Sequence, residues 1–587
     1  MEGRRFRRPL ESAALGALFL TKLGIVLWAL DRGFGIGEEG VFLLNLNRPW
    51  DATPGYEYHR LLTLLGRPPA LGVVAARAIR VVMELAAVAV LVSGVLRWYR
   101  ARFDREGAEA VLPVVLLCLA GTFLSAASRS LSYNDLTNLC VFAAAGGLFH
   151  LAADPRRGGP LVPAGLAMGM GFLSGLQLFV KFPAAILLVL SVPPLLWVAL
   201  RSEPAATRLR LLAAFGAGVP LGVAPIVLAS GGPANVVDNY REAFLLGSYL
   251  GYDPLRILRN YLVYDLLSHA HLVLSIGVFG ACLGAFRLLR RLRPERPSTA
   301  PDATLAASLA AALAVLVLAT ARLHPEFVHP SLLALYGVLL LSLLALVLAA
   351  SRAGGTASLR DLGLGLVLVA LPFVCIVGTD VALTLKLPSH GAPLSVAIAV
   401  LASRVRSLGY RLLPATVVLA VSATSAGVFL HTQVFQPYGL ATPIYEQRHP
   451  VEELQGVKVD RESARFLEEL SATLTKAGYR TGDPVVALDY MPGLVHYLGA
   501  TSPGSAYYMY DNPAFNCFLL NRTELERPPF VLLGKPMSEA QRGCLEAFDL
   551  DAGFELVGVL RNPYGSVYTY FFNARALPDL FVHAPRR

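Results

Sequence analysis

Charged residues are scarce in this chain. They make up only 16% of its 587 residues, whereas hydrophobic residues make up 55% and the mean hydropathy is +0.55. A soluble globular protein has an apolar share of about 45–50% even when glycine is counted. The composition therefore argues against a soluble globular protein and predicts a polytopic α-helical membrane protein.

Cysteine and lysine are also rare. Of the six cysteines, four lie in apolar segments without the spacing of metal ligands (Cys118, Cys140, Cys282, Cys375), so we expect them to be small core residues. Six lysines leave 45 of the 51 basic residues as arginine, a bias typical of a GC-rich bacterial genome. The net charge of +10 comes from short clusters between apolar runs, as in cytoplasmic loops, so no nucleic-acid partner is expected.

Apolar runs and basic clusters alternate along residues 1–430. Arg4, Arg5, Arg7 and Arg8 precede the first run, so the positive-inside rule predicts a cytoplasmic N-terminus in a bacterial inner membrane. The alternation predicts about thirteen transmembrane helices: 11–30, 71–96, 110–128, 136–152, a hairpin over 160–200, 211–230, 269–286, 303–320, 331–350, 362–378, one before Arg404, and 412–430. The odd number places the C-terminus outside.

Residues 431–587 have a different composition. Helical periodicity over 461–478 and a second helix near 538–548 combine with apolar, β-branched runs at 484–489, 530–533, 554–560 and 567–572. We predict a small extracytoplasmic α/β domain. Because that compartment is oxidising, its two cysteines, Cys517 and Cys544, are predicted to form a disulfide.

The loop after the first apolar run, residues 31–70, is unusually acidic. Five carboxylates and one histidine lie within thirty residues: Asp31, Glu38, Glu39, Asp51, Glu57 and His59. Glycines on both sides of the Glu38–Glu39 pair let its backbone bend without a Cβ penalty. An exposed loop between two spans is often simply polar, so composition alone leaves both a structural and a functional interpretation open.

Two motifs resemble GT-C class membrane glycosyltransferases. The segment Glu38-Glu39-Gly40-Val41-Phe42-Leu43, which follows an apolar helix and a short turn, resembles their first outer loop, where the usual pair is Asp-Glu. The glycine-rich run from Ala164 to Lys181 is similar to a helix that ends in lysine in many of these proteins. The aminoarabinose and protein O-mannosyl transferases are of this type.

This resemblance implies an inverting transferase. Its donor would be an undecaprenyl- or decaprenyl-phosphate sugar, and its acceptor a lipid, a glycan or a protein at the outer membrane face. The reaction needs a carboxylate to take a proton from the acceptor hydroxyl and positive charge to hold the leaving phosphate. The predicted donor-phosphate residues are Lys181, Arg241, Arg322, His324 and Lys386.

The resemblance assigns the base to Glu38 or Glu39. We favour Glu38, which takes the place of the family's Asp, with Asp51 a distant third; Asp51 and His59 are also candidates for contacting the acceptor. Adjacent side chains of an extended segment point to opposite faces, so one glutamate should face the site while the other pairs with a cation, caps a helix or binds a metal. The cofactor is unknown, and a divalent metal at Glu38 and Glu39 stays an alternative.

Other interpretations remain open at this point. Lys181 could be a boundary lysine that extends toward water, and loop polarity explains Arg322 and His324 as well as phosphate binding does. A non-catalytic GT-C-like scaffold or lipid-binding protein would have the same architecture. A lipid or sugar transporter would carry ionisable residues near the midplane of broken helices, whereas here they are predicted at the outer edge.

Overall fold

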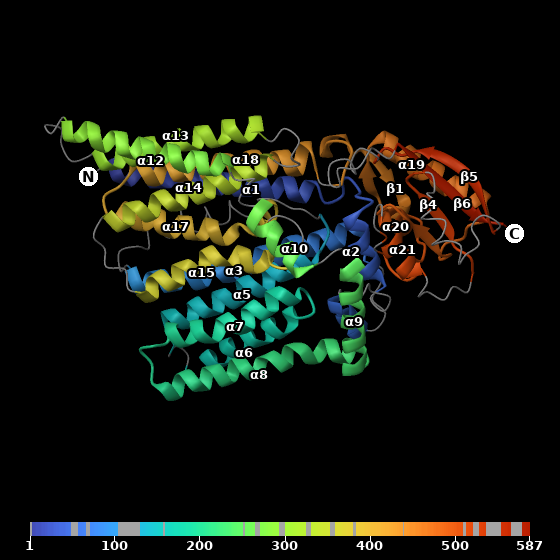
Figure 1. The fold of residues 1–587 in the computed structure, drawn as a ribbon, viewed down its shortest axis with the longest axis horizontal. Helices are drawn as coiled ribbons and strands as arrows, with labels where there is room; N and C mark the ends of the chain where they lie inside the picture. Colours follow the sequence, from blue (N-terminus) through green and yellow to red (C-terminus); the bar gives the residue numbers. More distant parts are fainter. Residues whose placement is uncertain are drawn as a thin grey trace.

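Long helices form most of the molecule. The structure is a computed structural model, and it describes residues 3–48, 57–65, 71–103, 129–155, 159–249, 253–264, 270–292, 300–323, 330–352, 359–379, 383–437, 439–506, 508, 512–520, 527–535, 553–564 and 578–586. Figure 1 shows the helices running roughly side by side, with the C-terminal strands gathered at one end of this bundle.

Nine helices within these ranges are long and apolar enough to cross a membrane, so the chain is a polytopic membrane protein. A helix suits this role because it satisfies every backbone hydrogen bond within itself. The nine are α1 (Gly3–Trp28), α3 (Val73–Phe103), α5 (Tyr133–Ala153), α7 (Phe182–Ala199), α8 (Ala205–Ala229), α12 (Ala270–Leu292), α13 (Ala300–Leu323), α14 (Pro330–Arg352) and α18 (Leu412–Leu430).

Three further helices correspond to other predicted spans. They are α6 (Leu161–Gln177), α15 (Leu359–Ile376) and α17 (Ala392–Ser407). The predicted span at 110–128 lies outside the described residues, so the number thirteen stays a prediction. The predicted hairpin over 160–200 corresponds to α6 and α7, with Lys181 at the turn between them.

Glycines bring α6 and α8 into direct backbone contact. A Cβ atom added to Gly171 of α6 would lie 2.0 Å from the carbonyl oxygen of Phe215 in α8, and one added to Gly175 would lie 2.1 Å from that of Val219. Cβ atoms added to Gly218 and Gly222 of α8 would come equally close to the backbone of α6. Small residues are what let membrane helices pack this closely. The glycine-rich stretch before Lys181 therefore has a packing function.

Polar contacts mark the end of the bundle away from the strands. Arg406 donates to both carboxylate oxygens of Glu11 at 3.0 and 2.6 Å. Asp302 accepts from three backbone N–H groups, those of Arg411, Leu412 and Leu413, and so caps α18. These contacts join the ends of α1, α13, α17 and α18.

Short elements lie at the opposite end, next to the strands. They are α2 (Glu38–Asn47), η2 (Glu57–Leu65), α9 (Pro233–Tyr249), α10 (Pro254–Arg259), η3 (Asn260–Tyr264), α16 (Leu383–Lys386) and η4 (Leu387–His390). After α18 the chain continues through η5 (His431–Phe435) and η6 (Ile444–Glu446) into the C-terminal elements.

The C-terminal elements form an α/β unit. A hairpin of β1 (His449–Val451) and β2 (Val457–Val459) flanks η7 (Glu452–Leu454). The main sheet has the order β3-β4-β6-β5, in which β3 (Val485–Ala487) and β4 (Phe530–Leu533) are parallel, whereas β5 (Phe554–Arg561) and β6 (Asp579–Pro585) complete it antiparallel. The helices are α19 (Arg461–Lys476), α20 (Pro492–Tyr497) and α21 (Pro513–Leu520).

Three of the predicted strands coincide with β3, β4 and β5, and the predicted helix 461–478 with α19. The predicted strand 567–572 and helix 538–548 lie outside the described residues. The strands β1, β2 and β6 were not predicted. Cys517 is disulfide-bonded, whereas Cys544 lies outside the described residues, so their pairing stays a prediction.

One hydrophobic core joins the acidic loop to the C-terminal unit. It contains Phe34, Ile36 and Leu43 from the loop and α2 together with Leu470, Val485, Leu494 and Val582 from the C-terminal elements. The predicted division at residue 430 assigns residues 31–48 to the transmembrane part. In the structure their apolar side chains pack with the C-terminal unit.

Candidate active site

The acidic pair begins helix α2. Gly37 is its N-cap residue, and both glutamates lie in the first turn, where negative charge interacts favourably with the helix dipole. The sequence analysis assumed an extended segment here, and this was wrong. In a helix neighbouring side chains point about 100° apart rather than to opposite faces.

Glu39 is buried and fully hydrogen-bonded. Its two carboxylate oxygens accept from Nε and Nη2 of Arg77, each at 2.8 Å, in a bidentate pair. Ser130 Oγ donates to the same carboxylate at 2.7 Å, and so does the backbone N–H of Gly35 at 2.9 Å. Only 5% of Glu39 is exposed to solvent. This side chain fixes the start of α2 to α3.

The surroundings of Glu39 keep it ionised. Burial alone would raise its pKa, but the charge and hydrogen bonds of Arg77, the charge of Arg129 and the Ser130 hydrogen bond lower the pKa to about 2. A carboxylate with such a pKa is a poor proton acceptor at neutral pH. Glu39 is therefore well suited to a structural ion pair.

Glu38 differs from its neighbour. It is half-buried, and within the part of the chain that the structure describes it makes no hydrogen bond or ion pair. Its direction follows from Phe42, one turn later on the same face of α2, because side chains at i and i+4 lie above one another. The Phe42 ring lies 6.0 Å from that of Tyr133, at the start of α5. Glu38 therefore shares the α2 face that is turned toward α5.

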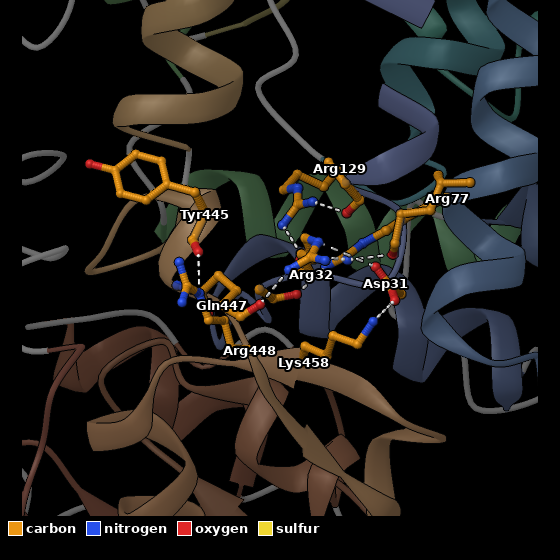
Figure 2. Close-up of polar contacts among 11 residues, drawn as sticks. Asp31, Arg32, Arg77, Arg129, Tyr445, Gln447, Arg448 and Lys458 are labelled. Atoms are coloured by element: carbon orange, nitrogen blue, oxygen red, sulfur yellow. Dashed lines mark hydrogen bonds and ion pairs between the residues drawn. The ribbon is translucent and has the colours of Figure 1, made fainter. Parts of the chain in front are cut away.

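Arginines hold the backbone just before α2. Besides Glu39, Arg77 donates to the carbonyl oxygens of Leu30, Arg32 and Gly33 at 2.8, 3.1 and 2.7 Å. Arg129 donates to the carbonyl oxygens of Arg32 and, at 2.6 Å, Ala29. Figure 2 shows both arginines converging on this turn from the bundle side. Residues 29–33 are thus held by charge-assisted hydrogen bonds.

The C-terminal unit contacts the same turn from the other side. Lys458 of β2 exchanges backbone hydrogen bonds with the turn, its N–H donating to Asp31 and its carbonyl accepting from Gly33. Its ammonium pairs with the Asp31 carboxylate at 2.5 Å, and Arg32 donates to the Gln447 carbonyl oxygen at 2.8 Å (Figure 2). The turn is therefore fixed between the bundle and the C-terminal unit.

Helix α2 also lies against α20 at van der Waals distance. A Cβ atom added to Gly40 would lie 2.1 Å from the backbone nitrogen of Gly493, whose N–H donates to the Ile36 carbonyl oxygen at 2.7 Å. The ring of Tyr490 packs against Gly37, and both Asp489 and Tyr490 have φ of +60°. Non-glycine residues rarely adopt this conformation, which costs about 1–3 kcal/mol each.

Two predicted cationic residues, Lys181 and Lys386, lie near His390 beside α5. Lys181 Nζ donates to the Cys375 and Ile376 carbonyl oxygens at 2.6 and 3.1 Å, where it caps the end of α15, and lies 5.9 Å from the Tyr133 ring centroid. Lys386 is half-buried at the end of α16 and is close enough for its charge, with that of Lys181, to affect His390. Two of the three Lys181 donors are therefore used within the fold.

His390 is a neutral side chain in this cluster. Burial, then the charges of Lys181 and Lys386, keep its pKa well below its usual range. Its Nδ1 lies 2.5 Å from the amide oxygen of Asn138, which only accepts, so Nδ1 carries the proton. Its Nε2 is then an acceptor, which does not suit a phosphate oxygen.

The remaining predicted residues lie on other elements or are not described. Arg241 is exposed on α9, and His59 is buried in η2, where its ring lies 3.9 Å from that of Tyr58. Asp51 and His324 lie outside the described residues, as does the side chain of Arg322.

The side chains of the candidate site provide few free ligands for a metal ion. Among the residues that the structure describes, no three His, Cys, Asp or Glu side chains are grouped as metal ligands would be. Both oxygens of Glu39 already accept hydrogen bonds, which leaves Glu38 as the carboxylate of the pair that could bind a cation. Metal use at this pair stays a prediction.

Sequence reasoning missed Arg77 and Arg80. Arg80 pairs with Asp135 at 2.9 Å, and Asp135 in turn forms the capping box of α5 with Ser132. The two arginines lie one turn apart on α3, within an otherwise apolar run. Ionisable residues inside a span are costly and usually functional or paired, and that signal could have identified both.

Comparisons with known proteins give a likeness among solved structures. No protein-family model and no curated protein matches the chain. Among solved structures it is similar to the oligosaccharyltransferase of Archaeoglobus fulgidus in the apo form, with a TM-score of 0.39 and 11% identity, over 87% of this chain and 69% of that chain. At this identity and TM-score, no residue role is carried over.

Proposed function

We propose that the protein is a membrane glycosyltransferase that moves a sugar from a polyprenyl-phosphate donor to an acceptor hydroxyl, with inversion, at the outer face of a bacterial inner membrane. One observation carries the proposal: of two adjacent glutamates at the end of a transmembrane bundle, Glu39 is paired with Arg77, while Glu38 makes no hydrogen bond or ion pair within the described residues. The many helices suit a donor that is itself embedded in lipid.

Glu38 would act as general base. It takes the proton from the acceptor hydroxyl while the hydroxyl oxygen forms a bond to the anomeric carbon from the side opposite the phosphate. The bond between that carbon and the phosphate oxygen breaks, and its electron pair leaves with the phosphate. Glu39, Arg77 and Ser130 would hold the start of α2 so that Glu38 keeps its direction.

Positive charge would hold the leaving phosphate. Lys386 is the best placed of the predicted cations, because it is half-buried and makes no hydrogen bond or ion pair within the described residues. Lys181 would add its charge and its third N–H, with Tyr133 between it and α2. Arg322 and His324 are retained as candidates on the sequence alone.

The decisive test compares Glu38→Gln with Lys386→Gln in purified, reconstituted protein. Glu38→Gln should keep donor binding near normal and lower turnover about a hundredfold or more. Lys386→Gln should weaken donor binding first. Glu462→Gln, at an exposed position of α19, serves as a matched control for the loss of one carboxylate. Wild-type turnover in Glu38→Gln would reject Glu38 as the base, and absent turnover in the wild type with several polyprenyl-phosphate sugars would favour a non-catalytic lipid-binding protein.

A further inference from the structure

Helix α9 lies across the end of the bundle. Figure 1 shows it running roughly at right angles to α6, α7 and α8, at the end where the C-terminal unit sits. Tyr240 attaches it to the bundle by donating to the Leu178 carbonyl oxygen, and Asn512 attaches its far end to the C-terminal unit by donating to the Tyr249 carbonyl oxygen at 3.0 Å. If α6–α8 cross a membrane, α9 lies parallel to the membrane surface.

The open face of α9 continues the lipid-facing surface of α7. Val237 and Phe244, seven residues apart on one face, are each 65% exposed. The Phe244 ring lies edge-on to that of Phe182, 6.3 Å away, and Phe182 is the first residue of α7 and is itself 39% exposed. An aromatic residue at a span boundary typically marks the membrane interface. The apolar face of α9 therefore lies at that depth.

The next helical segment repeats this pattern with more positive charge. On α10 and η3, Leu255, Leu258 and Leu262 are 75%, 51% and 62% exposed. Arg256 and Arg259 lie between them and are also exposed. Asp253 is used as the N-cap of α10, where its carboxylate accepts from the Leu255 N–H at 3.0 Å. Leucines alternating with arginines are typical of a helix lying in the headgroup region.

Positive charge outweighs negative charge on α10 and η3, where Arg256 and Arg259 are exposed and the carboxylate of Asp253 is used as the N-cap. The exposed arginines Arg241, Arg256 and Arg259 make no ion pair within the described residues, whereas α9 itself carries two carboxylates, the exposed Asp238 and the half-buried Glu242. We infer that α9, α10 and η3, called here the interfacial platform (residues 233–249 and 253–264), bind anionic phospholipid headgroups through these arginines, with the leucines and Phe244 inserted among the acyl chains.

The platform is tied to the cation cluster of the candidate site. The Tyr261 hydroxyl donates to the Thr379 carbonyl oxygen at 2.5 Å and accepts from the Gly378 N–H at 3.1 Å, just beyond the carbonyl groups that hold Lys181. The platform therefore contacts the residues that directly follow the carbonyl groups holding Lys181. That the lipids bound by the platform include the polyprenyl phosphate that carries the donor sugar rests on the proposed function. The inference that the platform binds anionic phospholipid does not rest on it.

The test titrates the full-length protein in detergent micelles with dansyl-labelled phosphatidylglycerol or phosphatidylcholine. Binding is measured as energy transfer from the protein's tryptophans to the dansyl group. The wild type should bind the anionic lipid more tightly. Replacing Arg241, Arg256 and Arg259 by Gln should weaken binding of the anionic lipid by more than tenfold, since one basic residue near an anionic surface contributes about fivefold, and leave the zwitterionic lipid unaffected. The matched control replaces Arg461, Arg465 and Arg480, which are exposed in the C-terminal unit.

Two further arms keep the inference open to refutation. Replacing Leu255, Leu258 and Leu262 by Ser should weaken the binding of both lipids several-fold. Millimolar inorganic phosphate should not displace the lipid; displacement would mean a site for free phosphate and overturn the platform. Equal binding by the triple Gln variant, with an unchanged melting temperature, would also overturn it. No sugar transfer is measured, so failure here leaves the proposed transferase activity standing.

Discussion

The buried pair of Glu39 and Arg77 should dominate the stability of this end of the molecule. A glutamate side chain with a pKa near 4.5 when unfolded has a pKa of about 2 here. Each pH unit between the two values corresponds to about 1.4 kcal/mol, so the pairing contributes about 3 kcal/mol at neutral pH. This agrees with the cost of about 3–5 kcal/mol for leaving one member of a buried ion pair alone.

The perturbation is Glu39→Gln, which keeps the shape and removes the charge. Because the folded-state pKa is depressed, the stabilisation is complete above pH 4.5 and is lost as the pH falls toward 2. The wild type should therefore exceed the variant by about 3 kcal/mol at pH 7, and the difference should shrink by about 1.4 kcal/mol per pH unit below pH 4.5. Both are measured as free energies of unfolding in detergent.

Arg77→Met tests the same interaction from the other side. It should cost more than Glu39→Gln, because three backbone carbonyl groups also lose a hydrogen bond, and of these only that of Arg32 is known to keep another donor, Arg129. Arg102→Met, at the far end of α3, is the matched control, since Arg102 is exposed and lies outside the site. The reasoning is refuted if Glu39→Gln costs less than about 1 kcal/mol at pH 7, or if its cost stays constant from pH 7 to pH 3.

Three smaller predictions follow from local geometry. Gly40→Ala should destabilise the fold by more than about 2 kcal/mol, because its Cβ would overlap backbone atoms of α20, while Gly24→Ala on α1, with open space around it, should be neutral or mildly stabilising; equal melting temperatures would contradict this. Lys181→Met should lower the unfolding free energy by about 1–3 kcal/mol, since the α15 carbonyl groups lose their donor, and Lys181→Arg should recover part of it; no loss in the Met variant would exclude the capping role. Thiol titration of the non-reduced, denatured protein should find Cys517 and Cys544 unreactive, and their reduction should cost about 3 kcal/mol; two reactive thiols there would reject the predicted pair.

The sequence was most informative where the physics is local. Apolar runs about twenty residues long predict helices whatever their partners are, and α1, α5 and α8 lie where they were expected. The acidic turn also stood out, because carboxylates are rare in this chain. Local patterns do not show which residues distant in the sequence will contact one another. Nothing in the sequence near Glu39 indicates that Arg77 or Ser130 will bind it.

The same limit explains the other differences. Arg77 was counted as part of an apolar run, since a hydropathy window averages a single charge away. The turn around Asp31 pairs with β2, a strand of three residues whose pattern is too short to detect. Lys181 was placed correctly at a helix boundary, yet its acceptors are carbonyl groups nearly two hundred residues later.

The pairing of Asp31 with Lys458 also has a consequence for how the protein is made. The two residues are 427 positions apart, and at about 5–20 residues per second the ribosome needs about 20–90 s to proceed from one to the other. During that interval α3 and the later helices of the bundle are synthesised, while β2 is not complete and α20 does not yet exist. The turn before α2 must therefore wait, half-assembled, until nearly the whole chain has been inserted. Any fragment released before β2 would lack the strand that pairs with this turn, so in a prematurely terminated chain the turn would be held from the bundle side alone.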